Sequence, residues 1–157
     1  MASGEAFGMR RFGTYAMNSL RMEKAYKGWG SELTTEISLV ESDMTRFAKK
    51  SGGYIGSDVV EKKMRDGVPI HLVYCEIDAD DADPMGNEPV LDGQKIIGVT
   101  TSGAYGHMTK KSLAFAYVSS GYETPGTQFS VQILGQKRKA SVLAEAAWDP
   151  TNDRLRG

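Results

Sequence analysis

The sequence holds one cysteine, no long hydrophobic run and almost no net charge, and each of these absences excludes a class of protein. Cys75 alone cannot form an intramolecular disulfide, and its place after the apolar run 70–74 predicts a buried strand thiol. No apolar run nears the roughly 18 residues of a membrane-spanning helix, and the N-terminus lacks the apolar core of a signal peptide. Without such a run we expect no membrane partner, and 19 basic against 20 acidic residues give a net charge of −1, which argues against nucleic acid as a partner.

Motifs for metals and nucleotides are also lacking. The two histidines, His71 and His107, form no pair with ligand spacing, which argues against a zinc site. The acidic stretch 76–83 invites comparison with a calcium loop, but an EF-hand begun at Asp81 would need Asp or Asn where Met85 stands. No Gly-x-Gly-x-x-Gly segment follows a predicted strand, so the dinucleotide fingerprint is absent. We therefore predict no metal site in this chain.

The first half of the sequence predicts two helices. One covers 15–24, with Thr14 as its N-cap, and follows a glycine-rich loop at 1–13. Its apolar face consists of Ala16, Met17 and Leu20. The other helix covers 58–66, is capped by Ser57, and ends at the glycine and proline that follow it. Between the helices, the mixed alternation of 34–47 predicts one or two short strands.

From residue 70 onward the pattern becomes strand-like. Short runs rich in β-branched and aromatic residues are separated by turns that contain glycine or proline, at 70–77, 95–101, 112–119, 127–134 and 137–146. Five such runs favour an antiparallel sandwich or barrel, with a tight hairpin at 134–137. The predicted fold class is α+β, with a domain boundary near residues 67–69.

Four blocks resemble the glycine-cleavage T-protein (aminomethyltransferase) superfamily in order and spacing. The first is Asn-Ser-Leu-Arg-Met-Glu-Lys at 18–24, followed by Trp-Gly-Ser-Glu-Leu at 29–33. The second is the acidic loop at 78–89, and the third is the loop 99–107, which contains Thr-Ser-Gly-Ala-Tyr-Gly-His. The fourth comprises the closing strands and tail at 111–118, 125–127 and 149–156. The Tyr-Ile-Gly at 54–56 is similar to the Phe-Ile-Gly of dimethylglycine and sarcosine dehydrogenases, which makes that branch the closest.

The resemblance implies that residues 1–67 are a remnant of the family's folate-binding domain and that 68–157 form its C-terminal β-barrel. It assigns folate contacts to Tyr15, Met22, Glu23, Lys24, Trp29 and Tyr105. The chemistry agrees, because a carboxylate only accepts hydrogen bonds and suits an aminopyrimidine ring that presents several N–H donors. Spacing alone favours a plainer reading, in which Glu23 and Arg21 are surface charges and Tyr15 and Met22 are core residues. Glu32 is expected to face solvent.

The resemblance also implies a longer protein that oxidises an N-methylated glycine and passes the one-carbon unit to tetrahydrofolate. FAD would bind in a preceding region, and the catalytic Asp of the folate domain would lie there too, so we expect no catalytic residue and no activity in this chain alone. Two other readings stay open. The chain could belong to a glycine-cleavage aminomethyltransferase, or it could be a non-catalytic barrel that mediates domain or subunit contacts.

Partners and compartment follow from the same resemblance. Tetrahydrofolate is the expected small-molecule partner. The apolar face of the first helix should be short of contacts, and such a surface favours a homo-oligomer. The expected location is the cytoplasm of a bacterium, or the mitochondrial matrix in a eukaryote.

Overall fold

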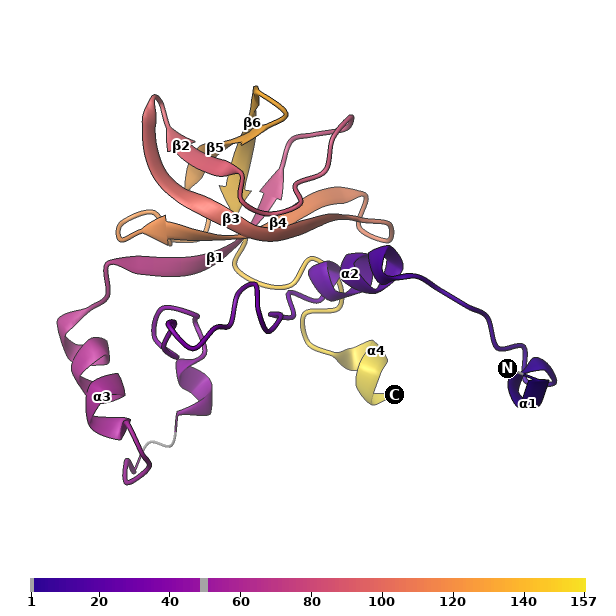
Figure 1. Cartoon of the computed structure of the whole chain (residues 1–157), viewed down its shortest axis with the longest axis horizontal. Helices are drawn as coiled ribbons and strands as arrows, with labels where there is room; N and C mark the ends of the chain where they lie inside the picture. Colours follow the sequence, from indigo (N-terminus) through magenta and orange to yellow (C-terminus); the bar gives the residue numbers. More distant parts are fainter. Residues whose placement is uncertain (1, 49–50) are drawn as a thin grey trace.

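The computed structural model describes residues 2–48 and 51–157, and its strands form a barrel with helices and loops on one side (Figure 1). The helices are α1 (Ala2–Glu5), α2 (Thr14–Glu23), the 3₁₀ helix η1 (Thr45–Phe47), α3 (Ser57–Asp66) and α4 (Asp153–Arg156). The strands are β1 (Ile70–Ile77), β2 (Pro89–Asp92), β3 (Lys95–Gly106), β4 (Lys111–Ser119), β5 (Gln128–Ile133) and β6 (Gln136–Val142). The predicted α+β class is confirmed.

The six strands close into an antiparallel barrel in the order β1-β4-β3-β2-β5-β6. Five of them match the predicted runs. The sixth, β2, was missed because it is only four residues long and begins with a proline, which weakens the strand signal. The predicted hairpin is a two-residue turn at Leu134 and Gly135, both with positive φ, which is the backbone that a tight hairpin of this twist requires.

The strand β4 is buried on both faces, which explains its unbroken run of hydrophobic residues. Ala114, Ala116 and Val118 point into the barrel and pack in its core. Leu113, Phe115 and Tyr117 alternate with them and pack outside the barrel in a second cluster that contains Met22. The barrel therefore has a covered outer wall, and α2 is the helix that reaches it.

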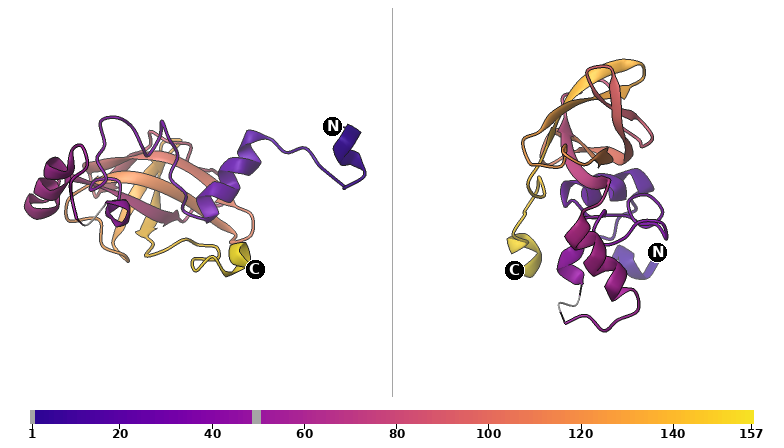
Figure 2. Two further views of the ribbon diagram at one scale, coloured as in Figure 1. Left: turned by 90° about the horizontal axis from the view of Figure 1, so that it is seen from below. Right: turned by 90° about the vertical axis from the view of Figure 1, so that its left-hand side faces the viewer.

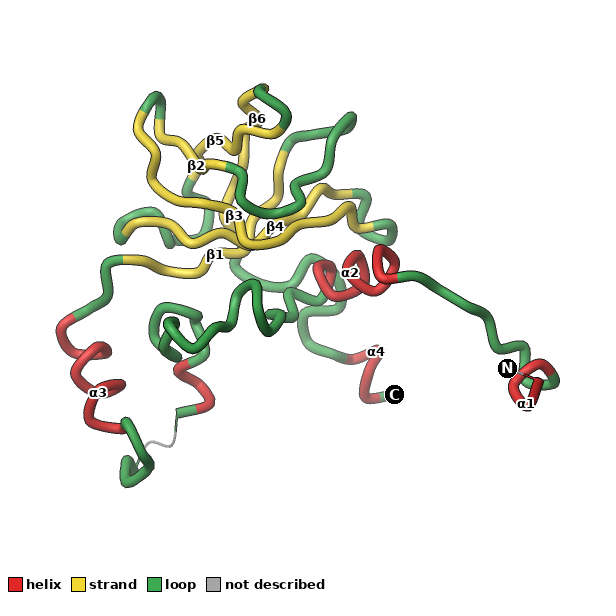
Figure 3. Tube along the Cα trace, in the orientation of Figure 1, coloured by secondary structure: helices red, strands yellow, loops and turns green. Residues whose placement is uncertain are grey.

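The chain between α2 and α3 is mostly loop (Figure 3), so the prediction of strands at 34–47 is wrong. All of residues 34–47 are described, and they form turns and η1. The turn groups there bond locally: the Ser38 amide donates to the Glu41 carboxylate at 3.0 Å, and the Ser42 amide donates to the Ser38 carbonyl at 3.1 Å. Such local bonds offer the backbone an alternative to a sheet ladder.

Two helix starts differ by one residue from the predictions. Thr14 and Ser57 are the first helical residues, and Gly13 and Gly56 occupy the N-cap positions without a side-chain hydrogen bond. Before α2, the chain extends away from the barrel toward α1, as the left view of Figure 2 shows. In the described part of the chain, no helix combines the length and apolar character needed to span a membrane.

A substitution at Gly98 tests how closely β3 and β4 approach each other in the barrel. A Cβ at this position would lie 2.1 Å from the Tyr117 carbonyl oxygen, which belongs to the backbone of the neighbouring strand and cannot turn aside. We expect Gly98→Ala to lower the free energy of unfolding by about 3 kcal/mol in urea denaturation. Gly13→Ala is the control, because no atom lies within 4 Å of a Cβ built there. Equal stabilities for the two variants would contradict the strand spacing.

Candidate functional site

The helix α2 turns the polar residues Asn18, Ser19 and Glu23 toward the barrel, and Met22 is its one buried apolar side chain, whereas an ordinary surface helix buries a mostly apolar face. Asn18 donates to the Gly103 carbonyl at 2.9 Å, and Ser19 donates to the Tyr105 carbonyl at 2.6 Å. On the other side, Met17 and Leu20 are more than half exposed. The expected shortage of contacts on this apolar face is what the structure shows.

The C-terminal end of α2 is a Schellman turn that fixes the direction of Glu23, its last residue. The Tyr26 amide donates to the Arg21 carbonyl at 3.0 Å, and the Ala25 amide donates to the Met22 carbonyl at the same distance. Ala25 takes a left-handed conformation, with φ of 51°, as this motif requires at that position. The chain therefore reverses immediately after Glu23.

The Glu23 carboxylate is held by backbone amides of the turn between β3 and β4. Its Oε1 accepts from the Met108 amide at 2.7 Å and from the Thr109 amide at 3.0 Å. A Cβ on Gly106 would lie 2.9 Å from that oxygen, so glycine is what allows the close approach. Glu23 is 2% exposed, and no donor to its Oε2 is found among the described residues. One oxygen is therefore fixed, and the other is free to accept.

A groove of about 490 Å³ lies between α2, the end of β3 and the loop before β2, and Glu23 lines it. The aromatic residues in its wall are Tyr15, Tyr105 and His107, and the rings of the last two meet edge to face at 5.2 Å. Leu20 and Met85 add apolar surface. The groove is thus a mainly apolar site with buried Glu23 in its wall, and its other acidic residue, Asp83, is exposed.

The structure brings together three of the six residues predicted to bind folate: Tyr15, Glu23 and Tyr105. Met22 has no exposed surface and packs in the cluster outside the barrel, which corrects the expectation that it faces a ligand. Its carbonyl accepts from the Tyr74 hydroxyl at 2.8 Å, so the backbone is anchored too. Helical spacing alone cannot tell a buried position from one that faces a groove.

Lys24 and Trp29 do not line the groove. Lys24 pairs with Asp149 at 3.1 Å and lines a different cavity of about 510 Å³, between the loops that follow α2 and β6. Trp29 is 76% exposed.

Within the described residues, no three His, Cys, Asp or Glu side chains are placed to hold a metal ion.

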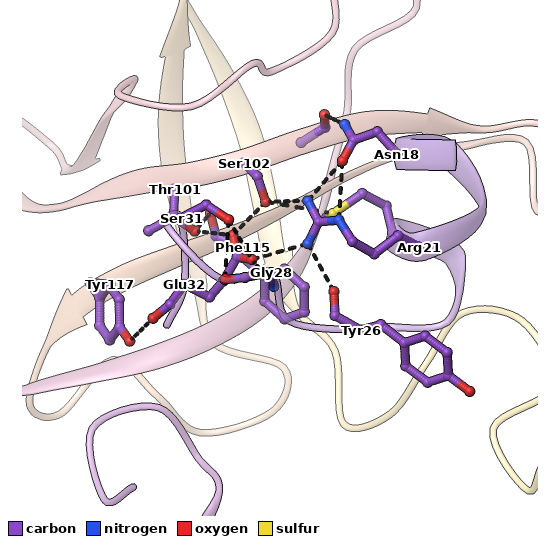
Figure 4. A network of polar contacts seen from close by, with 12 residues as sticks. Asn18, Arg21, Tyr26, Gly28, Ser31, Glu32, Thr101, Ser102, Phe115 and Tyr117 are labelled. Carbon is purple, nitrogen blue, oxygen red and sulfur yellow. Dashed lines mark hydrogen bonds and ion pairs between the residues drawn. The ribbon is translucent and has the colours of Figure 1, made fainter. Parts of the chain in front are cut away.

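Beside the groove, the partly buried Arg21 and the buried Glu32 form an ion pair at 3.0 Å (Figure 4). All five N–H donors of the Arg21 guanidinium are used. They go to the Asn18 side-chain oxygen (twice), the Ser102 hydroxyl, the Tyr26 carbonyl and the Glu32 carboxylate. The pair therefore joins α2, the loop after it and β3.

Glu32 has no exposed surface, so the expectation that it faces solvent is wrong. Besides Arg21, its carboxylate accepts from the Gly28 amide at 2.7 Å, the Ser31 hydroxyl at 2.9 Å, the Thr101 hydroxyl at 2.7 Å and the Ser102 hydroxyl. Burial alone would raise its pKa, but the hydrogen bonds from Ser102, Thr101 and Gly28, with the charge of Arg21, outweigh burial and lower the pKa of Glu32. The carboxylate is therefore ionised at neutral pH.

Two known protein families match the sequence of this chain. The family described as the glycine cleavage T-protein C-terminal barrel domain matches residues 71–149, and the GCVT N-terminal domain matches residues 1–52. The chain belongs to the glycine-cleavage T-protein family. This T-protein chain also resembles the solved structure of glycine cleavage system aminomethyltransferase T from Bartonella henselae, with a TM-score of 0.79 at 21% identity, over 86% of this chain and 38% of that one.

Several curated relatives carry different names. The chain is 38% identical to human mitochondrial dimethylglycine dehydrogenase over 99% of its own length, and 34% identical to an aminomethyltransferase of Koribacter versatilis over 91%. It is 31% identical to the mouse mitochondrial pyruvate dehydrogenase phosphatase regulatory subunit over 82%. The chain spans 18% of the human dehydrogenase, 38% of the aminomethyltransferase and 15% of the regulatory subunit.

The pKa of Glu32 gives a prediction for stability against pH. Because folding lowers this pKa below its ordinary value of 4.5, the carboxylate stabilises the fold above that pH, and the stabilisation is lost as the pH falls below it. Glu32→Gln should lower the free energy of unfolding by about 3 kcal/mol at pH 7, because it leaves Arg21 without its buried partner. Urea denaturation between pH 7 and pH 3 should show this difference shrinking. Glu36→Gln, at an exposed position, is the control; a difference that stays constant with pH would contradict the assignment.

Proposed function

We propose that this T-protein chain forms one wall of a tetrahydrofolate site in a demethylating oxidoreductase of the dimethylglycine and sarcosine dehydrogenase type. The observation that carries the proposal is the Glu23 carboxylate, which is buried, fixed through one oxygen by two backbone amides, and free at the other. A carboxylate in this state is an oriented acceptor. It suits the pyrimidine edge of a pterin, which presents N–H groups.

The rest of the groove fits the same ligand. A pterin has flat faces that pack against aromatic and aliphatic side chains, and Tyr15, Tyr105 and Leu20 line the groove beside Glu23. A volume of about 490 Å³ lies within the range of small-molecule sites. When bound, tetrahydrofolate would take up the one-carbon unit between its N5 and N10 amine nitrogens. The residues of this chain would bind and orient it, and none of them is assigned a catalytic role.

The oxidation itself would take place elsewhere in the full-length protein, with FAD in a preceding region. The identity to dimethylglycine dehydrogenase is higher than to the aminomethyltransferases among the relatives named here, which favours the oxidoreductase. Relatives described as mitochondrial are consistent with the matrix, and we propose that location for a eukaryotic source and the cytoplasm for a bacterial one.

Two other functions are supported by particular relatives. The aminomethyltransferase of Koribacter versatilis supports a role in glycine cleavage, which would use the same groove for folate. The regulatory subunit from mouse, whose name describes no catalysis, supports a barrel that acts through contacts with other chains. A measurement of folate binding distinguishes the non-catalytic barrel, which would not bind folate, from the oxidoreductase and the aminomethyltransferase, which would.

Glu23→Gln tests the folate site. The substitution keeps the shape but replaces one acceptor oxygen with a donor, so the charge-assisted bond to the pterin is lost and two donors face each other. We expect tetrahydrofolate affinity, measured by calorimetry, to fall by about 2–4 kcal/mol. Glu36→Gln should bind as the wild type does, because Glu36 is exposed and does not line the groove. Equal affinities for the two variants, or no binding by the wild-type chain, would contradict the proposal.

We further propose that the exposed face of α2 associates with the same face of a second copy. Met17 is 53% exposed, and the preceding segment adds Phe12 at 73%, so apolar side chains lie uncovered both on α2 and just before it. A two-fold axis would let each copy cover the surface of the other.

Met17→Lys tests this association without changing the groove, because Met17 does not line it. Sedimentation should show a concentration-dependent dimer for the wild type and a monomer for Met17→Lys, since a buried, unpaired charge opposes the contact. Ile55→Lys is the control, at a fully exposed position outside α2. A wild-type chain that stays monomeric at all concentrations, or a dimer that survives Met17→Lys, would refute the proposed interface.

A further inference from the structure

We propose that the Arg21–Glu32 ion pair is the positioning device of the groove, which holds Glu23 at the place where it can receive a ligand. This inference rests on the proposed role of Glu23 in folate binding. Neither Arg21 nor Glu32 lines the groove, yet Glu32 accepts five hydrogen bonds and Arg21 donates five.

The pair fixes α2 against β3 at one point. The Ser102 hydroxyl accepts from Arg21 Nη2 at 2.9 Å and donates to Glu32 Oε1, so it completes a closed set of bonds. The Thr101 hydroxyl donates to the same carboxylate oxygen. Because Arg21 and Glu32 lie on either side of the turn that ends α2, their pairing also holds that turn closed.

The bonds to the groove continue along the same contact between helix and strand. From Ser102, β3 runs on to Gly103 and Tyr105, whose carbonyls accept from Asn18 and Ser19. Glu23 follows Arg21 by two residues, or about 3 Å along the helix axis. A shift of α2 at Arg21 must therefore move Glu23 relative to the amides that hold it.

An arginine and a glutamate at these two positions are better suited to orienting α2 than to stabilising the fold. A buried ion pair is often no more stabilising than apolar residues of the same volume, because desolvation offsets the attraction. The gain from this pair is direction: the planar guanidinium offers five donors in a fixed fork, and its four acceptor groups lie on α2, the loop after it and β3. Lysine, with three donors on a flexible stem, could not make the same set.

The chain contains a matched control in Glu41. This carboxylate is also buried, and it accepts from Lys63 at 2.6 Å and from the Ser38 amide at 3.0 Å. Its carbonyl accepts from Leu72 at the start of the barrel, and it does not line the groove. Glu41→Gln therefore removes a comparable buried charge without touching the contact between α2 and β3.

The test measures amide hydrogen exchange at Met108 and Thr109, the two donors to Glu23, in the absence of ligand. Glu32→Gln should make these amides exchange about tenfold faster relative to those of Cys75 and Ala114 in the barrel, while Glu41→Gln should leave that ratio unchanged. Ser102→Ala, a milder change, should act in the same direction if Glu32→Gln does not fold. Equal ratios in all variants, or the same change in Glu41→Gln, would overturn the proposal.

A second readout separates this inference from the proposed function. Tetrahydrofolate affinity should fall about tenfold in Ser102→Ala, in which Glu23 itself is intact, and should not change in Glu41→Gln. If exchange at Met108 and Thr109 responds as expected but the wild-type chain binds no folate, the positioning role stands and the folate assignment fails. If folate binds and Ser102→Ala leaves both readouts unchanged, the positioning role fails alone.

Discussion

The Glu32 carboxylate is cut off from solvent, and a buried carboxylate is stable only where hydrogen bonds replace its water. That requirement draws five donors from α2, the loop after it and β3 to one point. The Schellman turn after Glu23, the direction of α2 and the register of the helix along β3 all depend on the same cluster. The groove lies between elements that this carboxylate holds together.

The reversed orientation of α2 follows from that constraint. Its polar residues satisfy carbonyls and amides of β3 and the turn beyond it, so Met17 and Leu20 are left outside and Met22 is the one apolar side chain that it buries. A helix of this kind gains little from apolar burial, and its position depends on directional bonds. The exposed apolar side chains of α2 and the groove beside it are the surfaces that we propose for binding another chain and a ligand.

The barrel is a scaffold that proteins with different names share, and each of those proteins has further parts beyond it. Relatives of this chain include proteins named as dehydrogenases, as aminomethyltransferases and as a regulatory subunit, and each is much longer than the chain itself. Such variety is expected where a fold holds a site whose chemistry comes from other parts of a protein. The Glu23 groove is the part of such a site that we propose this chain contributes.

The sequence by itself determined five of the six strands and both longer helices, because periodicity and turn residues act over short distances. The family followed from the resemblance of four sequence blocks. The sequence also predicted Glu23 as a candidate ligand residue, because the block at 18–24 that resembles the family is one continuous stretch of sequence. It could not show that Glu32 is buried, because Thr101 and Ser102, which donate to it, lie about 70 residues away along the chain. Nor could it separate buried Met22 from exposed Tyr15, which share one helical spacing. Only the packing of α2 on the barrel decided which side chains face the groove, because burial depends on partners that are distant in sequence.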